Sequence, residues 1–160
     1  MSTAYIALGA NLGDPVATVD GAFAALAGLP QTRLAATSAL YRTAPVGIVE
    51  QPEFINAAAR IETGLAPEAL LDALLAIEQR FGRVRAERNG PRTLDLDILL
   101  YDDLVLDTPR LNLPHPRLHL RAFVLYPLAD VVPAADFPLP GRGTLAAWLP
   151  AVANQGIVRL

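Results

Sequence analysis

The sequence predicts an α+β fold, in which helices pack on an antiparallel β-sheet. Segments typical of strands alternate with segments whose apolar residues recur at helical spacing, and their order is strand–helix–strand–strand–helix–strand. Hydrophobic residues make up 52% of the chain and charged residues 18%, a composition typical of globular domains. A chain of 160 residues can bury a substantial core, so we expect residues 1–160 to form a single domain.

The first strand is predicted in "AYIALGANLG", residues 4–13, which ends in a loop containing Gly and Asn. A helix follows, because Asp14 can cap its N-terminus and Pro15 suits its first turn. Gly28 marks the end of this helix. Its apolar residues recur at helical spacing: Val16, Val19, Phe23 and Leu26.

The middle of the chain predicts two strands and a second helix. The strands are "TRLAATSALYRT" at 32–43 and "FINAAARIET" at 54–63, with a loop containing Pro and Gly between them. Pro67 and Glu68 open the second helix, which ends at Gly82. Its apolar face consists of Leu70, Leu71, Leu74, Ile77 and Phe81.

An arginine-rich loop at 82–92 leads into the strand "LDLDILLY" at 94–101. The remaining predicted elements are short strands or a hairpin at 103–107 and 110–114, a helix at 117–131, and a helical turn at 144–150. Pro127 is expected to kink or end the helix at 117–131. The complete order corresponds to a split βαβ, or ferredoxin-like, arrangement with three layers, α/β/α.

Composition excludes several classes of function. The chain has no lysine, which rules out a phosphate-binding P-loop, and no cysteine, which rules out disulfides and thiolate metal sites. The net charge of −3 argues against a polyanion-binding protein, and no apolar run approaches the roughly 20 residues that span a bilayer. The first 15 residues lack the features of a signal peptide. We therefore expect a cytoplasmic monomer that binds neither nucleic acid nor membrane.

Two aspartates stand on one face of the strand at 94–101. Asp95 and Asp97 are two residues apart, so they point the same way with carboxyl-bearing carbons roughly 6.5 Å apart. Such a pair suits Mg²⁺, which commonly binds one or two carboxylates together with substrate phosphates. All 13 basic residues are arginines, and eight lie between positions 80 and 121, where they could hold phosphate. The alternative is a solvated strand face with the arginines as counter-ions.

Four other residues allow two interpretations each. His115 could donate to a phosphate or pack at a turn, and Asn56 could bind the edge of a ligand or satisfy nearby backbone groups. Phe54 and Phe123 are most simply core residues, and only a planar ligand would make them stacking surfaces.

Several segments together resemble the 6-hydroxymethyl-7,8-dihydropterin pyrophosphokinase family of the folate pathway. The matching stretches are "YIALGANLGDP", "YRTAPVG", "QPEFINAA", "GRVRAERNGPRTLDLDILLY" and "LPHPRLHLRAFVLYPLADVVP". They occur in the family's order, and "GPRTLDLDIL" with "PHP" twenty residues later is very specific. The resemblance implies a ferredoxin-like sandwich that transfers a diphosphoryl group from ATP to the pterin hydroxymethyl oxygen and releases AMP.

The resemblance also implies roles for individual residues. Asp95 and Asp97 would hold two Mg²⁺ ions and act in catalysis together with Arg83 and Arg92. ATP would contact Glu78, Arg85, Arg92, Ile98, Arg110, Asn112, His115 and Arg121. The pterin would contact Thr43, Val46, Phe54, Asn56 and Phe123.

The chain departs from the family pattern at Asn89, where familiar members often carry Trp. We expect the loops at 43–53 and 82–92 to close over the ligands. Two other functions remain open. An RNA-binding sheet is disfavoured by the negative charge and by the lack of a suitable aromatic pattern. A catalytically inactive relative that binds nucleotide is disfavoured because both aspartates and the key arginines are present.

Overall fold

The computed structural model describes residues 1–43, 52–82 and 93–160. The main sheet consists of β1 (Ser2–Ala10), β2 (Thr32–Thr37), β3 (Tyr41–Thr43), β4 (Phe54–Thr63), β5 (Asp95–Tyr101) and β10 (Ile157–Arg159). The helices are α1 (Pro15–Ala27), α2 (Pro67–Arg80), α3 (Ala122–Val131) and α4 (Leu145–Val152), with a 3₁₀ turn at Leu118–Leu120. Two small hairpins complete the described elements: β6 (Leu106–Asp107) with β7 (Asn112–Leu113), and β8 (Pro138–Leu139) with β9 (Gly143–Thr144).

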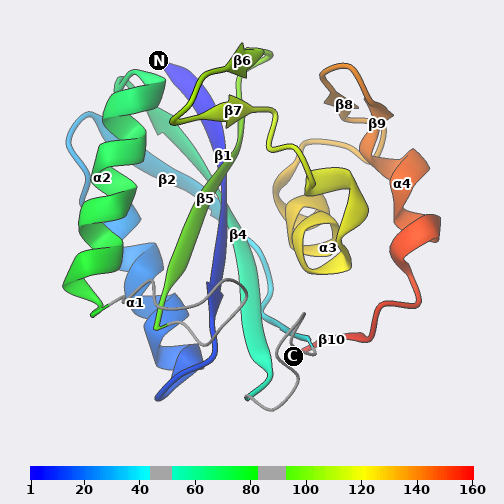
Figure 1. Ribbon diagram of the computed structural model, residues 1–160, viewed down its shortest axis with the longest axis horizontal. Helices are drawn as coiled ribbons and strands as arrows, with labels where there is room; N and C mark the ends of the chain where they lie inside the picture. The colour runs from blue at the N-terminus through cyan, green and yellow to red at the C-terminus, as the bar shows by residue number, and fades with distance from the viewer. Residues whose placement is uncertain (44–51, 83–92) are drawn as a thin grey trace.

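The six-stranded sheet has the order β10–β3–β4–β1–β5, and β2 also pairs with β4. All of these pairings are antiparallel. Helices α1 and α2 cover one face, and α3 covers the other with α4 packed beside it (Figure 1). This arrangement confirms the predicted α+β, ferredoxin-like fold with three layers.

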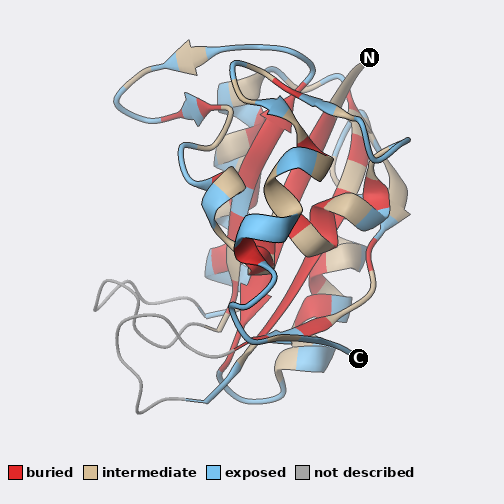
Figure 2. Ribbon diagram, turned by 90° about the vertical axis from the view of Figure 1, so that its right-hand side faces the viewer, coloured by how far each residue is buried: buried red, intermediate tan, exposed pale blue. Residues whose placement is uncertain are grey.

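Alternation along the strands divides the interior into two cores. In β1, Ile6 and Leu8 face α1 and α2 and pack with helix residues such as Leu26 and Leu74. Tyr5, which directly precedes Ile6, faces the opposite way and packs with α3 residues such as Leu125. Burial is therefore densest along the central strands (Figure 2). No helix in the three described ranges is long and apolar enough to span a membrane.

The predicted starts of the first two helices are confirmed. Asp14 caps α1, since its carboxylate accepts a hydrogen bond of 3.2 Å from the backbone N–H of Ala17, and Pro15 occupies the first turn. Helix α2 begins at Pro67 and buries Leu70, Leu74 and Ile77, as its spacing predicts. Burying these side chains against the sheet fixes both helices on the same face.

The single strand predicted at 32–43 is wrong, because the structure divides it into β2 and β3. At the division, the backbone N–H of Ser38 donates to Ala58, and the Ser38 hydroxyl accepts from the N–H of the same residue. The serine side chain thus replaces part of the ladder with β4, and the chain leaves regular pairing. Strand β10 and the β8–β9 hairpin were not predicted.

The continuous helix predicted at 117–131 is also wrong. A 3₁₀ turn at Leu118–Leu120 is followed by an extended residue, Arg121, and α3 starts only at Ala122. Pro127 does not end α3, which runs on to Val131. Proline removes only one backbone donor, and the buried Leu128 and Val131 hold the last turn against the sheet.

Candidate active site

A pocket lies on the α3 face of the sheet, where α3 leaves the ends of the central strands uncovered. The space between its lining atoms is about 730 Å³, a figure that includes open solvent at the pocket mouth. Its lining residues are Ala7, Leu8, Gly9, Thr43, Phe54, Asn56, Asp95, Asp97, Leu99, His115, Arg121, Phe123 and Val124. Eight of these residues were predicted as site residues: Thr43, Phe54, Asn56, Asp95, Asp97, His115, Arg121 and Phe123.

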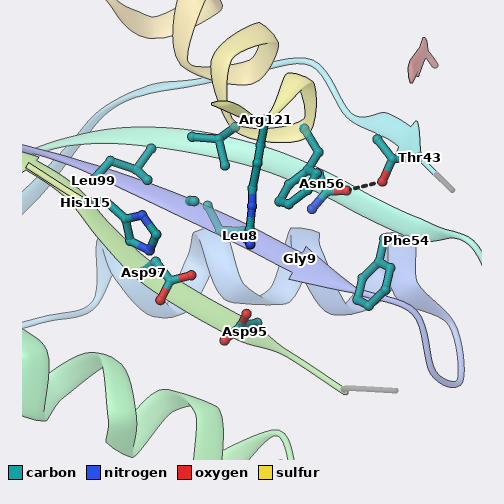
Figure 3. Close-up of a pocket in the computed structure, with 13 residues that line it drawn as sticks. Leu8, Gly9, Thr43, Phe54, Asn56, Asp95, Asp97, Leu99, His115 and Arg121 are labelled. Atoms are coloured by element: carbon teal, nitrogen blue, oxygen red, sulfur yellow. Dashed lines mark hydrogen bonds between the residues drawn. The ribbon is translucent and has the colours of Figure 1, made fainter. Parts of the chain in front are cut away.

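The two aspartates form one side of the pocket floor. In the β1–β5 ladder, Asp95 lies opposite Gly9 and Asp97 lies opposite Ala7. Both carboxylates point to the α3 face (Figure 3), as the alternating pattern predicts, while the intervening Leu96 is buried in the other core. Asp97 is exposed and Asp95 is half-buried. The small residues of β1 leave space beside this acidic pair.

A register shift in β5 extends this arrangement towards α3. The β1–β5 pairing passes from Ile98 opposite Ile6 to Leu100 opposite Tyr5, so Leu99 is an extra residue. Leu99 lines the pocket beside Asp97, whereas Tyr101 returns to the core beneath α1 and α2. The strand therefore presents Asp95, Asp97 and Leu99 to the pocket. After the extra residue, its next side chains again alternate correctly, and Tyr101 lies in the core beneath α1 and α2.

The chemistry of the pair fits a hard divalent cation. Carboxylate oxygens are the ligands that Mg²⁺ prefers, and it usually keeps waters and substrate phosphates as its other ligands. Among the described residues, no group of three or more His, Cys, Asp or Glu side chains could hold a metal ion. Two carboxylates could hold such an ion together with water and substrate phosphates.

His115 enters the pocket beside Asp97 (Figure 3). Its backbone N–H donates to the Leu99 carbonyl at 2.9 Å, and its Nδ1 accepts from the N–H of Arg117 at 3.3 Å. Burial is the main cause that lowers the pKa of His115, and the charge of Arg121 lowers it further, against the opposing charge of Asp95. A neutral imidazole whose Nδ1 accepts carries its proton on Nε2, which makes that nitrogen a hydrogen-bond donor.

Arg121 reaches the pocket from the start of α3 and extends towards the strands (Figure 3). Its guanidinium carbon lies 5.3 Å from the centre of the Phe123 ring, within the range of a cation–π interaction. This contact joins a positively charged group to the aromatic wall. The pocket therefore has carboxylates on β5 and a cation facing them from α3.

The opposite end of the pocket carries a polar pair on β3 and β4. The Thr43 hydroxyl donates to Oδ1 of Asn56 at 2.7 Å, and both side chains are buried. This bond orients the amide, so that Nδ2 of Asn56 can donate and the Thr43 oxygen can accept. A Cβ at Gly9 would lie 3.0 Å from Nδ2 of Asn56, so glycine gives this amide its space. Phe54, which pairs with Thr43 in register, supplies a second aromatic ring.

Four other predicted site residues do not line the pocket but lie around the outer edge of β5. Glu78, buried in α2, accepts a 2.8 Å hydrogen bond from the backbone N–H of Leu96. Ile98 is buried in the core beneath the same helix. Arg110 forms salt bridges with Asp72 and Glu68 of α2. Asn112 is exposed on β7, which packs near β5.

The remaining predicted site residues, Val46, Arg83, Arg85 and Arg92, lie outside the described residues. The same holds for Asn89 and for most of the two loops predicted to close over ligands. Sequence reasoning missed Ala7 and Gly9 as pocket residues. The available signal was the small residues within an otherwise apolar strand, since glycine inside a strand often marks a close approach of another group.

Comparisons with known proteins agree on one family. The family model for 7,8-dihydro-6-hydroxymethylpterin-pyrophosphokinase (HPPK) matches residues 5–133. The 2-amino-4-hydroxy-6-hydroxymethyldihydropteridine pyrophosphokinase of Pseudomonas aeruginosa is 52% identical over 156 residues, 98% of this chain and 95% of that protein. The enzyme of the same name from Haemophilus influenzae is 44% identical over 160 residues, 100% of this chain and 99% of that protein.

Solved structures show the same fold. The crystal structure of Plasmodium falciparum HPPK-DHPS with pteroate matches with a TM-score of 0.75 at 14% identity. The match covers 94% of this chain and 42% of that longer chain. At this identity the likeness supports the fold alone.

Proposed function

The chain belongs to the 7,8-dihydro-6-hydroxymethylpterin-pyrophosphokinase family, and we propose that the pocket beneath α3 is where it carries out the reaction of that family. The reaction is the ATP-dependent transfer of a pyrophosphoryl group to hydroxymethyldihydropterin in folate biosynthesis. The observation that carries the proposal is a concave site among the described residues that brings together two carboxylates, a cation, two aromatic rings and the hydrogen-bonded side chains of Thr43 and Asn56.

Asp95 and Asp97 are the metal-binding residues in this proposal, and they would hold two Mg²⁺ ions. When bound, these ions neutralise the phosphate charge and make the attacking hydroxyl more acidic. The space that Ala7 and Gly9 of β1 leave beside the two aspartates supports this assignment. The two carboxylates would supply the protein ligands of the ions, and substrate phosphates would be the other ligands.

The pterin occupies the end of the pocket near β3 and β4. Its polar edge meets Nδ2 of Asn56 as donor and the Thr43 oxygen as acceptor, and backbone near Val46 completes the edge. Its flat ring system stacks against Phe54 and Phe123, since heteroaromatic rings favour offset stacking on aromatic side chains. This orientation directs the hydroxymethyl group towards the aspartates.

The phosphates lie between the aspartates and α3. Nε2–H of His115 and the guanidinium of Arg121 donate to them from the α3 side. Arg83, Arg85 and Arg92 contribute further positive charge, with Arg83 and Arg92 acting on the transferred group. The adenosine lies along the outer edge of β5, where Glu78, Ile98, Arg110 and Asn112 gather.

In the proposed reaction the pterin hydroxymethyl oxygen attacks the β-phosphorus of ATP in line. A bond forms between these two atoms, the bond from the β-phosphorus to the α,β-bridging oxygen breaks, and AMP leaves with that oxygen. The hydroxyl proton is released, and the protein contributes positioning and charge neutralisation. Asn56 and Thr43 orient the nucleophile, while His115 and Arg121 orient the diphosphoryl group.

The test is AMP formation from ATP, Mg²⁺ and 6-hydroxymethyl-7,8-dihydropterin, measured for the wild type beside Asp97→Ala. Pterin-dependent AMP release that collapses in Asp97→Ala is the expected result. Asp103→Ala is the matched control, because Asp103 is exposed in the turn after β5 and should leave the rate unchanged. Equal rates in wild type and Asp97→Ala would reject the metal assignment. A folded wild type that releases no AMP would instead indicate a nucleotide-binding relative without this activity.

We further propose that residues 1–160 act as a single domain and as a cytoplasmic monomer without a nucleic-acid partner. The two cores share one sheet, which supports a single folding unit. The absence of cysteine and the net charge of −3 support the location and the lack of a polyanion partner. Light scattering at micromolar concentration measures the oligomeric state directly.

A further inference from the structure

Arg121 occupies an unusual position for an arginine, the N-cap of α3. Its backbone is extended, with φ −130° and ψ 122°, and its carbonyl accepts from the N–H groups of Val124 and Leu125. Caps of this kind are usually Ser, Thr, Asp or Asn, whose side chains accept from the first N–H groups of the helix. A guanidinium has donors and no acceptor, so Arg121 cannot play this part. The acceptor must come from elsewhere.

Gln155 supplies it from a distant part of the chain. Its Oε1 accepts from the backbone N–H of Ala122 at 2.9 Å, and its Nε2 donates to the carbonyl of Leu120 at 3.1 Å. These are the backbone groups immediately before and after Arg121. One side-chain amide therefore holds the chain on both sides of a pocket-lining cation.

The segment that carries Gln155 is itself fixed at both ends. Before it, α4 buries Leu145 and Val152 in the core beneath α3. After it, Gly156 adopts φ +74° and turns the chain into β10, where Ile157 pairs with Thr43 of the pocket. The segment thus joins the α3 end of the pocket to its β3 end. It lies beyond residue 133, where the match to the family model ends.

We propose that Gln155 is a positioning residue for Arg121, and that the C-terminal segment thereby sets the direction in which this cation enters the pocket. The two hydrogen bonds fix the backbone on either side of Arg121, and this fixes the direction of its Cα–Cβ bond. The long side chain then starts from a defined point towards the phosphates. The inference rests on the proposed phosphate-binding role of Arg121.

The alternative is that Gln155 only stabilises α3 as a helix cap. Both roles predict some loss of stability when the amide is removed, so stability cannot separate them. They differ in their dependence on Arg121. A positioning residue loses its effect on nucleotide binding once the arginine side chain is gone, whereas a cap does not.

The experiment is a double-mutant cycle with Gln155→Leu and Arg121→Ala, each alone and combined. It measures kcat and KM for ATP and the Kd of a non-hydrolysable α,β-methylene ATP analogue with Mg²⁺. We expect Gln155→Leu alone to lower kcat/KM for ATP by about tenfold and to weaken analogue binding, with KM for the pterin unchanged. In the Arg121→Ala background, we expect Gln155→Leu to have no further effect.

Two further variants keep the result interpretable. Gln155→Glu retains the acceptor for the Ala122 N–H and should recover part of the lost kcat/KM. Asn154→Ala, an exposed neighbour in the same turn, should behave like the wild type. Thermal unfolding of all variants establishes that each is folded at the assay temperature.

Equal losses from Gln155→Leu in both backgrounds would overturn the proposal and leave a helix cap. Unchanged analogue affinity in Gln155→Leu would also overturn it, as would an Arg121→Ala variant that binds and reacts normally. The analogue affinity does not depend on turnover. A wild type without pterin-dependent AMP release would therefore reject the proposed function while the cycle still decides the role of Gln155.

Discussion

The two faces of the sheet use the same strands for opposite purposes. On the α1–α2 face, β1, β4 and β5 present large apolar side chains that pack with those of the two helices. On the α3 face, the same strands present Ala7, Gly9, Asn56, Asp95 and Asp97, and α3 leaves them uncovered at one end. One face is filled by the chain itself, whereas the other is left to be filled by a ligand.

This contrast explains how two aspartates are tolerated in a strand. Alternation places Leu94, Leu96 and Ile98 in the closed core, so the hydrophobic burial that stabilises β5 comes from one face. The carboxylates on the other face remain accessible to solvent and ligands, which avoids the cost of burying charge. We call the α1–α2 face the closed face and the α3 face, which carries the pocket, the open face. Changes on the closed face should therefore affect stability, and changes on the open face should affect binding and catalysis.

The largest expected effect lies on the open face. Asp95→Asn keeps the shape of the side chain but removes its charge, and we expect kcat to fall by about 10³-fold, since electrostatic contacts to the transition state contribute this much. The midpoint of thermal unfolding without ligands should change little. The measurement is pterin-dependent AMP release over a range of Mg²⁺ concentrations. A variant with wild-type kcat at saturating Mg²⁺ would contradict the role of Asp95.

A core substitution on the closed face should lower stability and leave kcat nearly unchanged. Leu74→Ala creates a cavity beneath α2, and we expect the free energy of unfolding to fall by about 3 kcal/mol. Below the unfolding temperature, kcat should remain close to that of the wild type. Urea unfolding measures the loss. Leu75→Ala on the same helix is the control, because Leu75 is partly exposed and should cost clearly less. A large fall in kcat for folded Leu74→Ala would remove the distinction between the faces.

A smaller effect is expected at Gly9, where β1 lies close to the Asn56 side chain of β4 on the open face. In Gly9→Ala, the new methyl would lie 3.0 Å from Nδ2 of Asn56, so the amide must shift away from its bond with Thr43. We expect KM for the pterin to rise by up to about tenfold, since a typical hydrogen bond contributes roughly 0.5–1.5 kcal/mol. KM for ATP should not change and serves as the internal control. Equal increases in both KM values would contradict a specific role of the hydrogen-bonded Thr43 and Asn56 side chains.

The closed face could be predicted from the sequence to a greater extent than the open one. Periodicity predicted the buried residues Leu70, Leu74 and Ile77, because a residue that packs in a core must recur with the period of its element. Alternation also predicted that Asp95 and Asp97 share a face. The family resemblance named Thr43 and Asn56 as pterin contacts, but the hydrogen bond between them depends on the pairing of β3 with β4, which local pattern does not contain.

The start of α3 was not predictable for a related physical reason. Local rules predicted continuous helix through Arg121, because nothing in residues 117–131 supplies the cap that allows the helix to begin at Ala122. That cap is Gln155, from a segment that pattern alone did not place beside the site. Long-range contacts of this kind can override the local preferences of a segment. Here the residue whose backbone is changed in this way is Arg121, which lines the pocket.

The smallest expected effect is a change in the pKa of one of two histidines on the α3 side of the sheet. His115 lines the pocket, whereas His119 packs against Trp148 with ring centres 4.7 Å apart. Burial is the main cause that lowers the pKa of each below its ordinary value of 6.5, with Arg121 as the next cause for His115 and Arg142 for His119. The folded state therefore binds these protons less readily than the unfolded state. The stability that the neutral rings contribute is complete above about pH 6.5 and is lost as the pH falls towards the lowered pKa values.

Ligand binding should change only one of these titrations. Phosphate groups beside His115 favour the imidazolium, so an α,β-methylene ATP analogue with Mg²⁺ should raise the pKa of His115 and leave that of His119 in place. The measurement is an NMR titration of the two imidazole C2 protons, with and without the analogue, and with His119→Gln to assign the signals. Equal shifts at both histidines would indicate a general change of the protein. An unchanged pKa of His115 would place the phosphates away from this side chain. Ligand recognition on the open face would then be confined to the two aspartates, Arg121 and the Thr43–Asn56 pair.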